Sequence, residues 1–344
     1  MRRILLLTLL LAAAPLTAET VRDLYTAEVT ATGRTQQALG VASREALAQV
    51  LVKVSGTAAV LGYPSIKSAL GNSRDYIQQY AFLAEDPAGE GVGVRIEFDG
   101  TSVTELVTAA GAPLWTANRP VVLAWLVAND AGGPHFVNRD SGPELTAALL
   151  TAFSRRGVPV QIPLFDLADA TALRVDEVWR LSEPAVELAS RRYEREDILV
   201  GRLRVSGEEL VEGEWSYLAA AGRRDRKVAP VSVAEFMDAG VALVADDMAA
   251  RFAVAPTEVG AEGILMSVTG IRSYADYAAV VSWLERVELI ERANVERVQG
   301  DRIQLRLVAQ ADAEQLAGII RLNEQFVPAP SGDVNEQLSY RGQN

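Results

Sequence analysis

The chain has 344 residues, no cysteine and one histidine, and its 45 acidic and 33 basic side chains give a formal net charge of −12. The absence of cysteine excludes disulfides, thiolate zinc sites and iron–sulfur clusters, and most catalytic zinc sites use more than one histidine. The acidic balance argues against non-specific binding to nucleic acid, which requires a basic surface. With 49% hydrophobic residues, the chain can fill the cores of two or three domains.

Residues 1–18 have the order of a secretory signal peptide. Arg2 and Arg3 precede an apolar stretch over residues 4–14 that contains no charged residue, and Pro15 ends this stretch before Ala18. The stretch is shorter than the roughly 20 residues that span a bilayer. We therefore expect cleavage after Ala18, export to the periplasm and no stable membrane insertion of the mature chain.

Residues 19–117 are predicted to form a small α+β module. Residues 24–32 alternate like a strand. Thr35 is placed to cap a helix whose apolar spacing continues to Gly56, where a left-handed residue ends it. The further elements predicted in this module are a helix over 65–80, a strand over 92–98 and a helix over 101–110.

Residues 118–258 are predicted to form a central α/β module. Residues 121–127 are a continuous apolar run, as in a strand that is buried on both faces. Ser232 and Glu235 form a capping box for a long helix that ends near Phe252. The other predicted elements are helices over 143–156 and 184–193 and strands over 158–164, 198–205, 210–219 and 226–230. This order indicates a mixed sheet with helices packed on it.

Residues 259–328 are predicted to form a ferredoxin-like module of the order β-α-β-β-α-β. Its predicted strands cover 264–268, 293–298, 302–308 and 324–327, with helices that begin after Ser273 and Asp312. Residues 329–344 are polar and aperiodic, so we expect a flexible tail. The predicted fold class is therefore α+β or mixed α/β, with three small modules in series.

Candidate catalytic groups are few, and the sequence identifies no catalytic, cofactor-binding or metal-binding residue. His135 has Asp140 and Ser141 close by in sequence, but a hydrolytic triad requires a geometry that the sequence does not supply. We interpret His135 as a loop residue.

Paired carboxylates are another possible source of catalysis, since glycosidases use two acids. Glu194, Glu196 and Asp197 precede a predicted strand, and Asp246 and Asp247 lie on a predicted helix. Adjacent helix residues point about 100° apart, so Asp246 and Asp247 cannot both face one site. We interpret these acids as a solvated surface.

A possible interaction surface consists of two groups of residues. Arg223, Arg224 and Arg226 belong to a basic run that could meet a phosphate, a lipid headgroup or an acidic partner, or could be a solvated hairpin tip. Trp115 and Arg119 mark the place where the first two modules are expected to dock.

Several short motifs recur in an order that resembles a known family. They are Asp23-Leu24-Tyr25, 44–47 (REAL), 50–56 (VLVKVSG), Tyr76, 78–80 (QQY), Pro113-Leu114-Trp115, Arg119-Pro120 and 198–202 (ILVGR). This order resembles the uncharacterised proteobacterial family catalogued as DUF 2066, a domain of unknown function. The resemblance implies no established activity, cofactor or catalytic residue.

The function expected from these observations is binding. We expect an exported, soluble, non-catalytic periplasmic accessory or scaffold protein of the cell envelope that contacts other envelope proteins and needs no cofactor. One alternative is a carboxylate-dependent hydrolase of envelope polysaccharide, with acids such as Glu196 and Asp197 in a cleft. Another is a periplasmic small-ligand-binding protein, with a pocket between the first two modules near Trp115.

Overall fold

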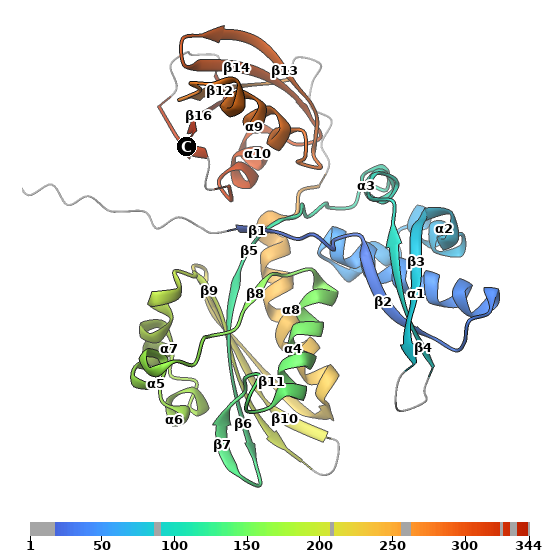
Figure 1. Ribbon diagram of the computed structural model, residues 1–344, viewed down its shortest axis with the longest axis vertical. Helices are drawn as coiled ribbons and strands as arrows, with labels where there is room; N and C mark the ends of the chain where they lie inside the picture. The colour runs from blue at the N-terminus through green and yellow to red at the C-terminus, as the bar shows by residue number, and fades with distance from the viewer. Residues whose placement is uncertain are drawn as a thin grey trace, which may run out of the picture.

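The computed structural model describes residues 18–85, 91–206, 210–255, 263–323, 326–330 and 336–342. The signal peptide predicted from the sequence, except for Ala18, lies outside these residues. Within them the fold is mixed α/β, as predicted, with four sheets of two, three, five and six strands (Figure 1). None of the described helices is both long and apolar enough to cross a membrane.

The N-terminal part of the chain forms a three-stranded antiparallel sheet in the order β2-β4-β3, which α1 covers on one face (Figure 1). Its elements are β1 (Ala18–Thr20), β2 (Thr26–Ala31), α1 (Gln36–Ser55), η1 (Ala58–Gly62), α2 (Pro64–Gly71), η2 (Ser73–Tyr76), β3 (Ile77–Glu85), β4 (Val92–Phe98) and α3 (Gly100–Ala109). The Thr35 side chain accepts a hydrogen bond from Ala38 N, and Gly56 ends α1 with a φ of 78°. Both predicted ends of α1 are thus confirmed.

The helix predicted over residues 65–80 is wrong in its second half. The α2 helix ends at Gly71, and residues from Ile77 onward form β3, which pairs with β4. Aromatic residues such as Tyr80 and Phe82 fit a half-buried sheet well, so pairing with β4 decides the conformation rather than local helical spacing.

The central part of the chain forms a six-stranded mixed sheet in the order β11-β10-β9-β6-β7, with β8 also paired to β6. Its elements are β5 (Asn118–Pro120), β6 (Val122–Asp130), β7 (Gly133–Phe136), α4 (Pro143–Arg156), β8 (Val160–Gln161), α5 (Leu167–Ala172), α6 (Val175–Trp179), α7 (Glu183–Ser190), η3 (Arg191–Tyr193), β9 (Asp197–Val205), β10 (Leu210–Ala219), β11 (Gly222–Ser232) and α8 (Val233–Phe252). The mixed sheet and the capping box of Ser232 and Glu235 are confirmed.

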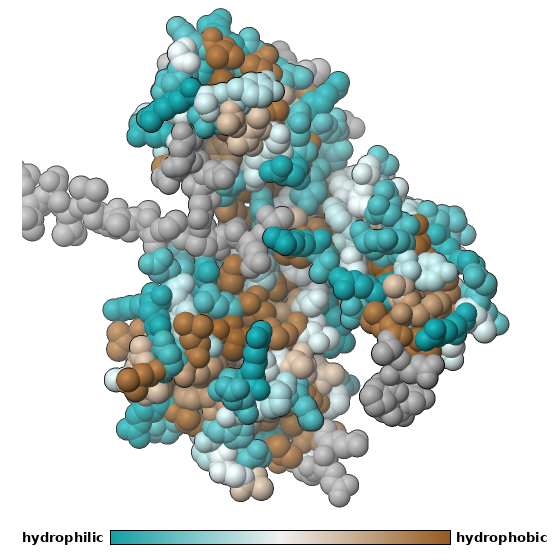
Figure 2. All heavy atoms as spheres, viewed as in Figure 1, coloured by the Kyte–Doolittle hydropathy of each residue, from teal (hydrophilic) through white to brown (hydrophobic). Residues whose placement is uncertain are grey.

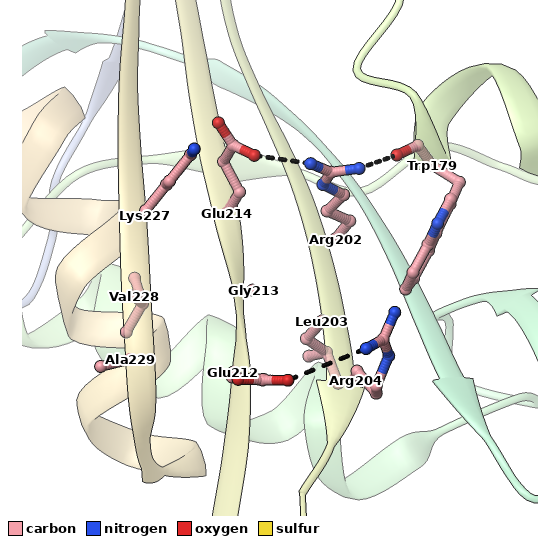
Figure 3. Close-up of a pocket in the computed structure, with 10 residues that line it drawn as sticks. All are labelled: Trp179, Arg202, Leu203, Arg204, Glu212, Gly213, Glu214, Lys227, Val228 and Ala229. Carbon is pink, nitrogen blue, oxygen red and sulfur yellow. Dashed lines mark hydrogen bonds and ion pairs between the residues drawn. The ribbon is translucent and has the colours of Figure 1, made fainter.

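Helices cover both faces of this sheet. The helices α4 and α8 pack on one face through a core that includes Trp215 and Phe236. The shorter helices α5, α6 and α7 pack on the other face through a second core around Trp125. These short helices reach only part of their face, which leaves the far ends of β9, β10 and β11 uncovered (Figure 3).

The C-terminal part of the chain forms a five-stranded sheet in the order β13-β14-β12-β16-β15. Its elements are β12 (Ile264–Thr269), α9 (Tyr274–Leu284), β13 (Ile290–Gln299), β14 (Arg302–Ala309), α10 (Ala313–Ile320), β15 (Phe326–Pro328) and β16 (Leu338–Gly342). The β16 strand lies within the predicted flexible tail and pairs in parallel with β12. It separates β12 from β15, so the strand order differs from the predicted four-stranded ferredoxin-like arrangement.

The cause of this difference is a short alternating pattern near the end of the chain. Leu338 and Tyr340 are buried, whereas Ser339 and Arg341 between and after them are not. Such alternation is typical of a strand that is covered on one face. The polar residues around it obscured the pattern in the sequence.

Candidate functional site

A groove of about 550 Å³ lies on the uncovered face of β9, β10 and β11 (Figure 3). The α6 residue Trp179 forms one wall, and Lys227 on β11 lies on the opposite side. The remaining lining residues are Arg202, Leu203, Arg204, Glu212, Gly213, Glu214, Val228 and Ala229. This volume is in the range of pockets that hold ligands, roughly 300–1,000 Å³.

Strand geometry explains why charged side chains line the groove. Successive residues of a strand point to opposite faces. On β10, Trp215 is buried against α8, so its neighbour Glu214 points to the other face. In the sheet register Glu214 lies between Arg202 of β9 and Lys227 of β11. The groove floor is therefore a row of alternating charges across three strands.

Arg202 is held firmly at one end of this row. Its Nη2 atom is 2.6 Å from Glu214 Oε2, and its Nη1 donates a 2.7 Å hydrogen bond to the carbonyl oxygen of Trp179. These two contacts fix the position of α6 relative to the sheet (Figure 3). A second, longer ion pair of 3.9 Å joins Arg204 and Glu212 beside the first.

Lys227 and Trp179 are two groups of the groove that are available to a ligand. Among the described residues, no ion pair or hydrogen bond involves the Lys227 ammonium group. The indole of Trp179 is partly exposed beside Arg202. An ammonium group attracts a carboxylate, and an indole offers a flat apolar surface with one hydrogen-bond donor. Together they can bind a segment that combines an acidic and an apolar group.

Gly213 allows β10 to run close to β9 between the two glutamates. A Cβ atom at this position would lie 2.0 Å from the carbonyl oxygen of Arg202. Any other residue would therefore push the two strands apart. The register of β10 against β11 also shifts between Val211 and Gly213.

The acids considered for a hydrolase do not form an open site, and the interpretation of all of them as solvated is wrong for Asp197 and Asp247. Asp197 is buried and accepts hydrogen bonds from Tyr217 Oη and, at 2.6 Å, from Arg251 Nη2. Asp247 is also buried, with its carboxylate 2.6 Å from Arg224 and 2.9 Å from Arg251. Desolvation, with the Asp197 charge, raises the pKa of Tyr217 well above its ordinary value, so this phenol stays protonated.

The neighbouring acids point elsewhere. Asp246 is exposed and pairs with Arg156 at 2.8 Å, whereas Asp247 is buried, which confirms that the two do not face one site. Glu194 and Glu196 are exposed next to the buried Asp197. Within the described residues, no three acidic or histidine side chains are grouped to hold a metal ion.

Trp115 and Arg119 lie at the junction of the N-terminal and central parts, and neither has any exposed surface. The Arg119 guanidinium stacks 3.8 Å from the centre of the Trp115 ring. It donates five hydrogen bonds to backbone carbonyl groups, those of Lys53, Trp115, Thr116, Arg156 and Gly157. These two residues join parts of this chain and line no outer surface.

The arginines of the predicted basic run each have an intramolecular partner. Arg223 contacts Asp225 and the carbonyl oxygen of Leu181, and Arg224 pairs with Asp247. Arg226 donates a hydrogen bond to the carbonyl oxygen of Ala239 on α8. The run therefore connects β11 to the rest of the central part.

The interpretation of His135 as a loop residue is wrong, because this residue lies in the short strand β7, pairs with Ala128 of β6 and is partly exposed. Its Nδ1 atom lies 3.1 Å from the carbonyl oxygen of Gly133 and 3.9 Å from Asp130. The backbone N–H groups of Asp140 and Ser141 bind the side chain of Asn138. Among the described residues, these contacts connect His135 to neither Asp140 nor Ser141.

Sequence reasoning missed the groove. Its charged residues come from three strands and Trp179 from a helix that was not predicted. The segments 202–204 (RLR) and 212–214 (EGE) carry opposite charges at alternate positions, which is the signal that could have predicted paired strands with a charged face.

The comparisons with known proteins concern the N-terminal part. The family described as "Domain of unknown function (DUF8605)" matches residues 18–116, less than a third of the chain. The predicted resemblance to DUF 2066 is therefore wrong, because its motifs consist of structural residue types that many α/β proteins share. Neither a curated protein nor a solved structure matches the chain. Over residues 18–116 the chain is similar to a family whose function is unknown.

Proposed function

We propose that this protein is a non-catalytic accessory or scaffold protein that binds another protein of the cell envelope through the groove beside Trp179. Residues 1–18 support export to the periplasm. The division into modules 19–117, 118–258 and 259–328 is part of this proposal, with one sheet of three or more strands in each.

The observation that carries the proposal is the combination of Trp179 and Lys227 across one groove. A sheet face that merely meets solvent also carries charged residues, and its charges can pair with one another. Here Arg202 and Glu214 pair in this way, but Lys227 lacks a partner among the described residues and Trp179 stands above the sheet. Tryptophan is enriched among the residues that dominate binding energy at protein interfaces.

Exposed apolar side chains on the neighbouring helices also favour a protein partner. Leu164, Leu167 and Leu188, on and beside α5 and α7, are 69%, 84% and 58% exposed. Figure 2 shows apolar surface over this part of the molecule. Exposed apolar patches commonly mark interaction sites. The ligand that fits is a loop or extended segment with an acidic side chain for Lys227 and an apolar side chain for Trp179.

Affinity capture with matched variants tests this proposal. The purified mature chain is used as bait in a periplasmic extract, with a chemical crosslinker, as wild type, Trp179→Ala, Lys227→Glu and Lys67→Glu. Lys67 is exposed on α2 and provides the same charge change away from the groove. We expect wild type and Lys67→Glu to recover one partner equally, and Trp179→Ala to recover it at least about tenfold less. No partner, or equal recovery by all four proteins, would refute the proposal.

A second candidate function is hydrolysis of polysaccharide in the same groove. Glu212 and Glu214 share one strand face, which places them about 7 Å apart, within the roughly 6.5–9.5 Å of an inverting glycosidase. However, both are ion-paired with arginine, whereas a general acid must be held protonated. Release of reducing sugar from peptidoglycan, lost in Glu212→Gln and Glu214→Gln, would support this function, and no release by wild type would exclude it.

A further inference from the structure

The outer edge of β2 is regular along its whole length, unlike the other sheet edges among the described residues. In the sheets of three or more strands, the edges at β3, β11 and β13 carry register shifts. The edge strands β7 and β15 contain proline, and β8 has two residues. Bulges, prolines and short strands prevent other chains from pairing at an edge. The sequence of β2 (TAEVTA) has no proline, and its register with β4 has no shift.

Three residues of β2 direct their backbone N–H and carbonyl groups away from the sheet, and two of these residues leave the groups open. Tyr25 O accepts a 3.0 Å hydrogen bond from Phe98 N of the β4 side. Because residues of an antiparallel pair alternate, Ala27, Val29 and Ala31 bond to β4, and Thr26, Glu28 and Thr30 face outward. Thr26 is already occupied, since its carbonyl oxygen accepts a 2.7 Å bond from Lys53 Nζ. The N–H and carbonyl groups of Glu28 and Thr30 have no hydrogen-bond partner among the described residues.

A cleft of about 400 Å³ lies along this edge. It is lined by residues 26–30 of β2, by α1 on one side and by Thr151, Ser154 and Arg155 of α4 on the other. The acids Asp23, Glu28 and Glu45 also line it. Arg95 lies 3.3 Å from Asp23 and 3.5 Å from Glu28, and Glu45 accepts a hydrogen bond from Gln49. The bases Lys53, Arg95 and Arg155 equal these acids in number. However, Arg155 pairs with Asp238 and Lys53 bonds to backbone carbonyl groups, so Glu45 lines the open strand edge without a basic partner among the described residues.

We propose that this cleft binds an extended peptide segment of another protein, which pairs with β2 as an additional strand and places a basic side chain beside Glu45. Backbone hydrogen bonds to Glu28 and Thr30 hold the segment, and the unpaired Glu45 carboxylate favours the basic side chain. This is the mode in which peptides add to open sheet edges. The site is separate from the groove beside Trp179, so either can fail without the other.

The probe is a capped, fluorescent synthetic peptide with the sequence of β4, Val-Gly-Val-Arg-Ile-Glu-Phe, which already forms an antiparallel partner of β2. Its affinity for the full mature chain is measured by fluorescence anisotropy. Glu28→Pro removes an outward N–H group without removing a bond to β4, whereas Glu28→Gln keeps this N–H group. We expect binding at least about tenfold weaker with Glu28→Pro and no more than about threefold weaker with Glu28→Gln.

Two further measurements do not depend on the folding of a variant. Two versions of the probe carry N-methyl groups on opposite sets of alternate amides. Only one set faces β2 in an antiparallel pair, so methylation of that set should abolish binding and methylation of the other set should not. Hydrogen exchange should slow for up to two amides within residues 24–32 when the peptide binds. Equal behaviour of both methylated peptides, no binding by wild type, or a β2-to-β2 dimer of this chain that Glu28→Pro dissociates would overturn the proposal.

Discussion

Removal of the Arg119 side chain should destabilise the junction between the N-terminal and central parts more than any surface substitution of arginine. The five carbonyl groups that this guanidinium binds come from the end of α1, the end of α4 and the connecting segment 115–116. Arg119→Met fills a similar volume but leaves these carbonyl groups without their donor.

The expected loss follows from these contacts. Hydrogen bonds to a charged group contribute about 1.5–3 kcal/mol each, but bonds that share one side chain are not additive. Breaking a buried charged interaction costs about 3–5 kcal/mol. We therefore expect Arg119→Met to lower the free energy of unfolding by about 4 kcal/mol. Arg119→Lys keeps the charge but loses the planar fork and the stacking on Trp115, so it should lose about half of that amount.

Urea unfolding, followed by circular dichroism and tryptophan fluorescence, measures these losses. Arg155→Met is the matched control, because Arg155 is partly exposed and pairs with Asp238 at 2.9 Å. An exposed pair of this kind contributes about 0–1 kcal/mol. If Arg119→Met and Arg155→Met had the same small effect, Arg119 would not hold the junction together.

Two other predictions concern buried groups. Burial, with the nearby Arg119 charge, lowers the pKa of Lys53 to about 8. Above this pH the unfolded chain binds more protons than the folded one. The free energy of unfolding of wild type, relative to that of Lys53→Met, should therefore rise by about 3 kcal/mol between pH 8 and 10.5, as measured by urea unfolding at each pH. A difference between the two proteins that does not change with pH would refute this pKa. A Cβ atom at Gly240 on α8 would lie 2.4 Å from the Trp215 ring, so Gly240→Ala should lower the thermal midpoint and cost about 1–3 kcal/mol. On α10, a Cβ atom at Gly318 meets nothing within 4 Å, so Gly318→Ala should raise the free energy of unfolding by about 0.5–1 kcal/mol. If Gly318→Ala destabilised the protein more than Gly240→Ala, the packing of Trp215 against α8 would be contradicted.

Local signals predicted those elements whose ends are set by their own residues. The Thr35 cap and Gly56 define α1, and Ser232 with Glu235 defines the start of α8. Elements that depend on a distant strand were harder to predict. Residues 77–80 became part of β3 because β4 is available to pair with them, and β16 formed because β12 has a free edge.

The candidate site depends on the same distant pairing. Arg202, Glu214 and Lys227 become neighbours because β9, β10 and β11 pair in one register, and Trp179 reaches them from α6. The sequence showed alternating charges but not which strands would lie side by side. Conversely, the density of arginine at 223–226 suggested an interaction surface. In the structure Arg224, although half exposed, pairs with the buried Asp247.

Site-specific photocrosslinking in growing cells tests the central claim most directly, namely that the groove beside Trp179 contacts another protein. A photoreactive residue is placed at Ala229 in the groove, and at Tyr274, which is 82% exposed on α9, as a control. We expect a discrete crosslinked product from position 229 that is lost when Trp179→Ala is added, and no such product from position 274. No product from position 229, or a product that Trp179→Ala leaves unchanged, would contradict the claim.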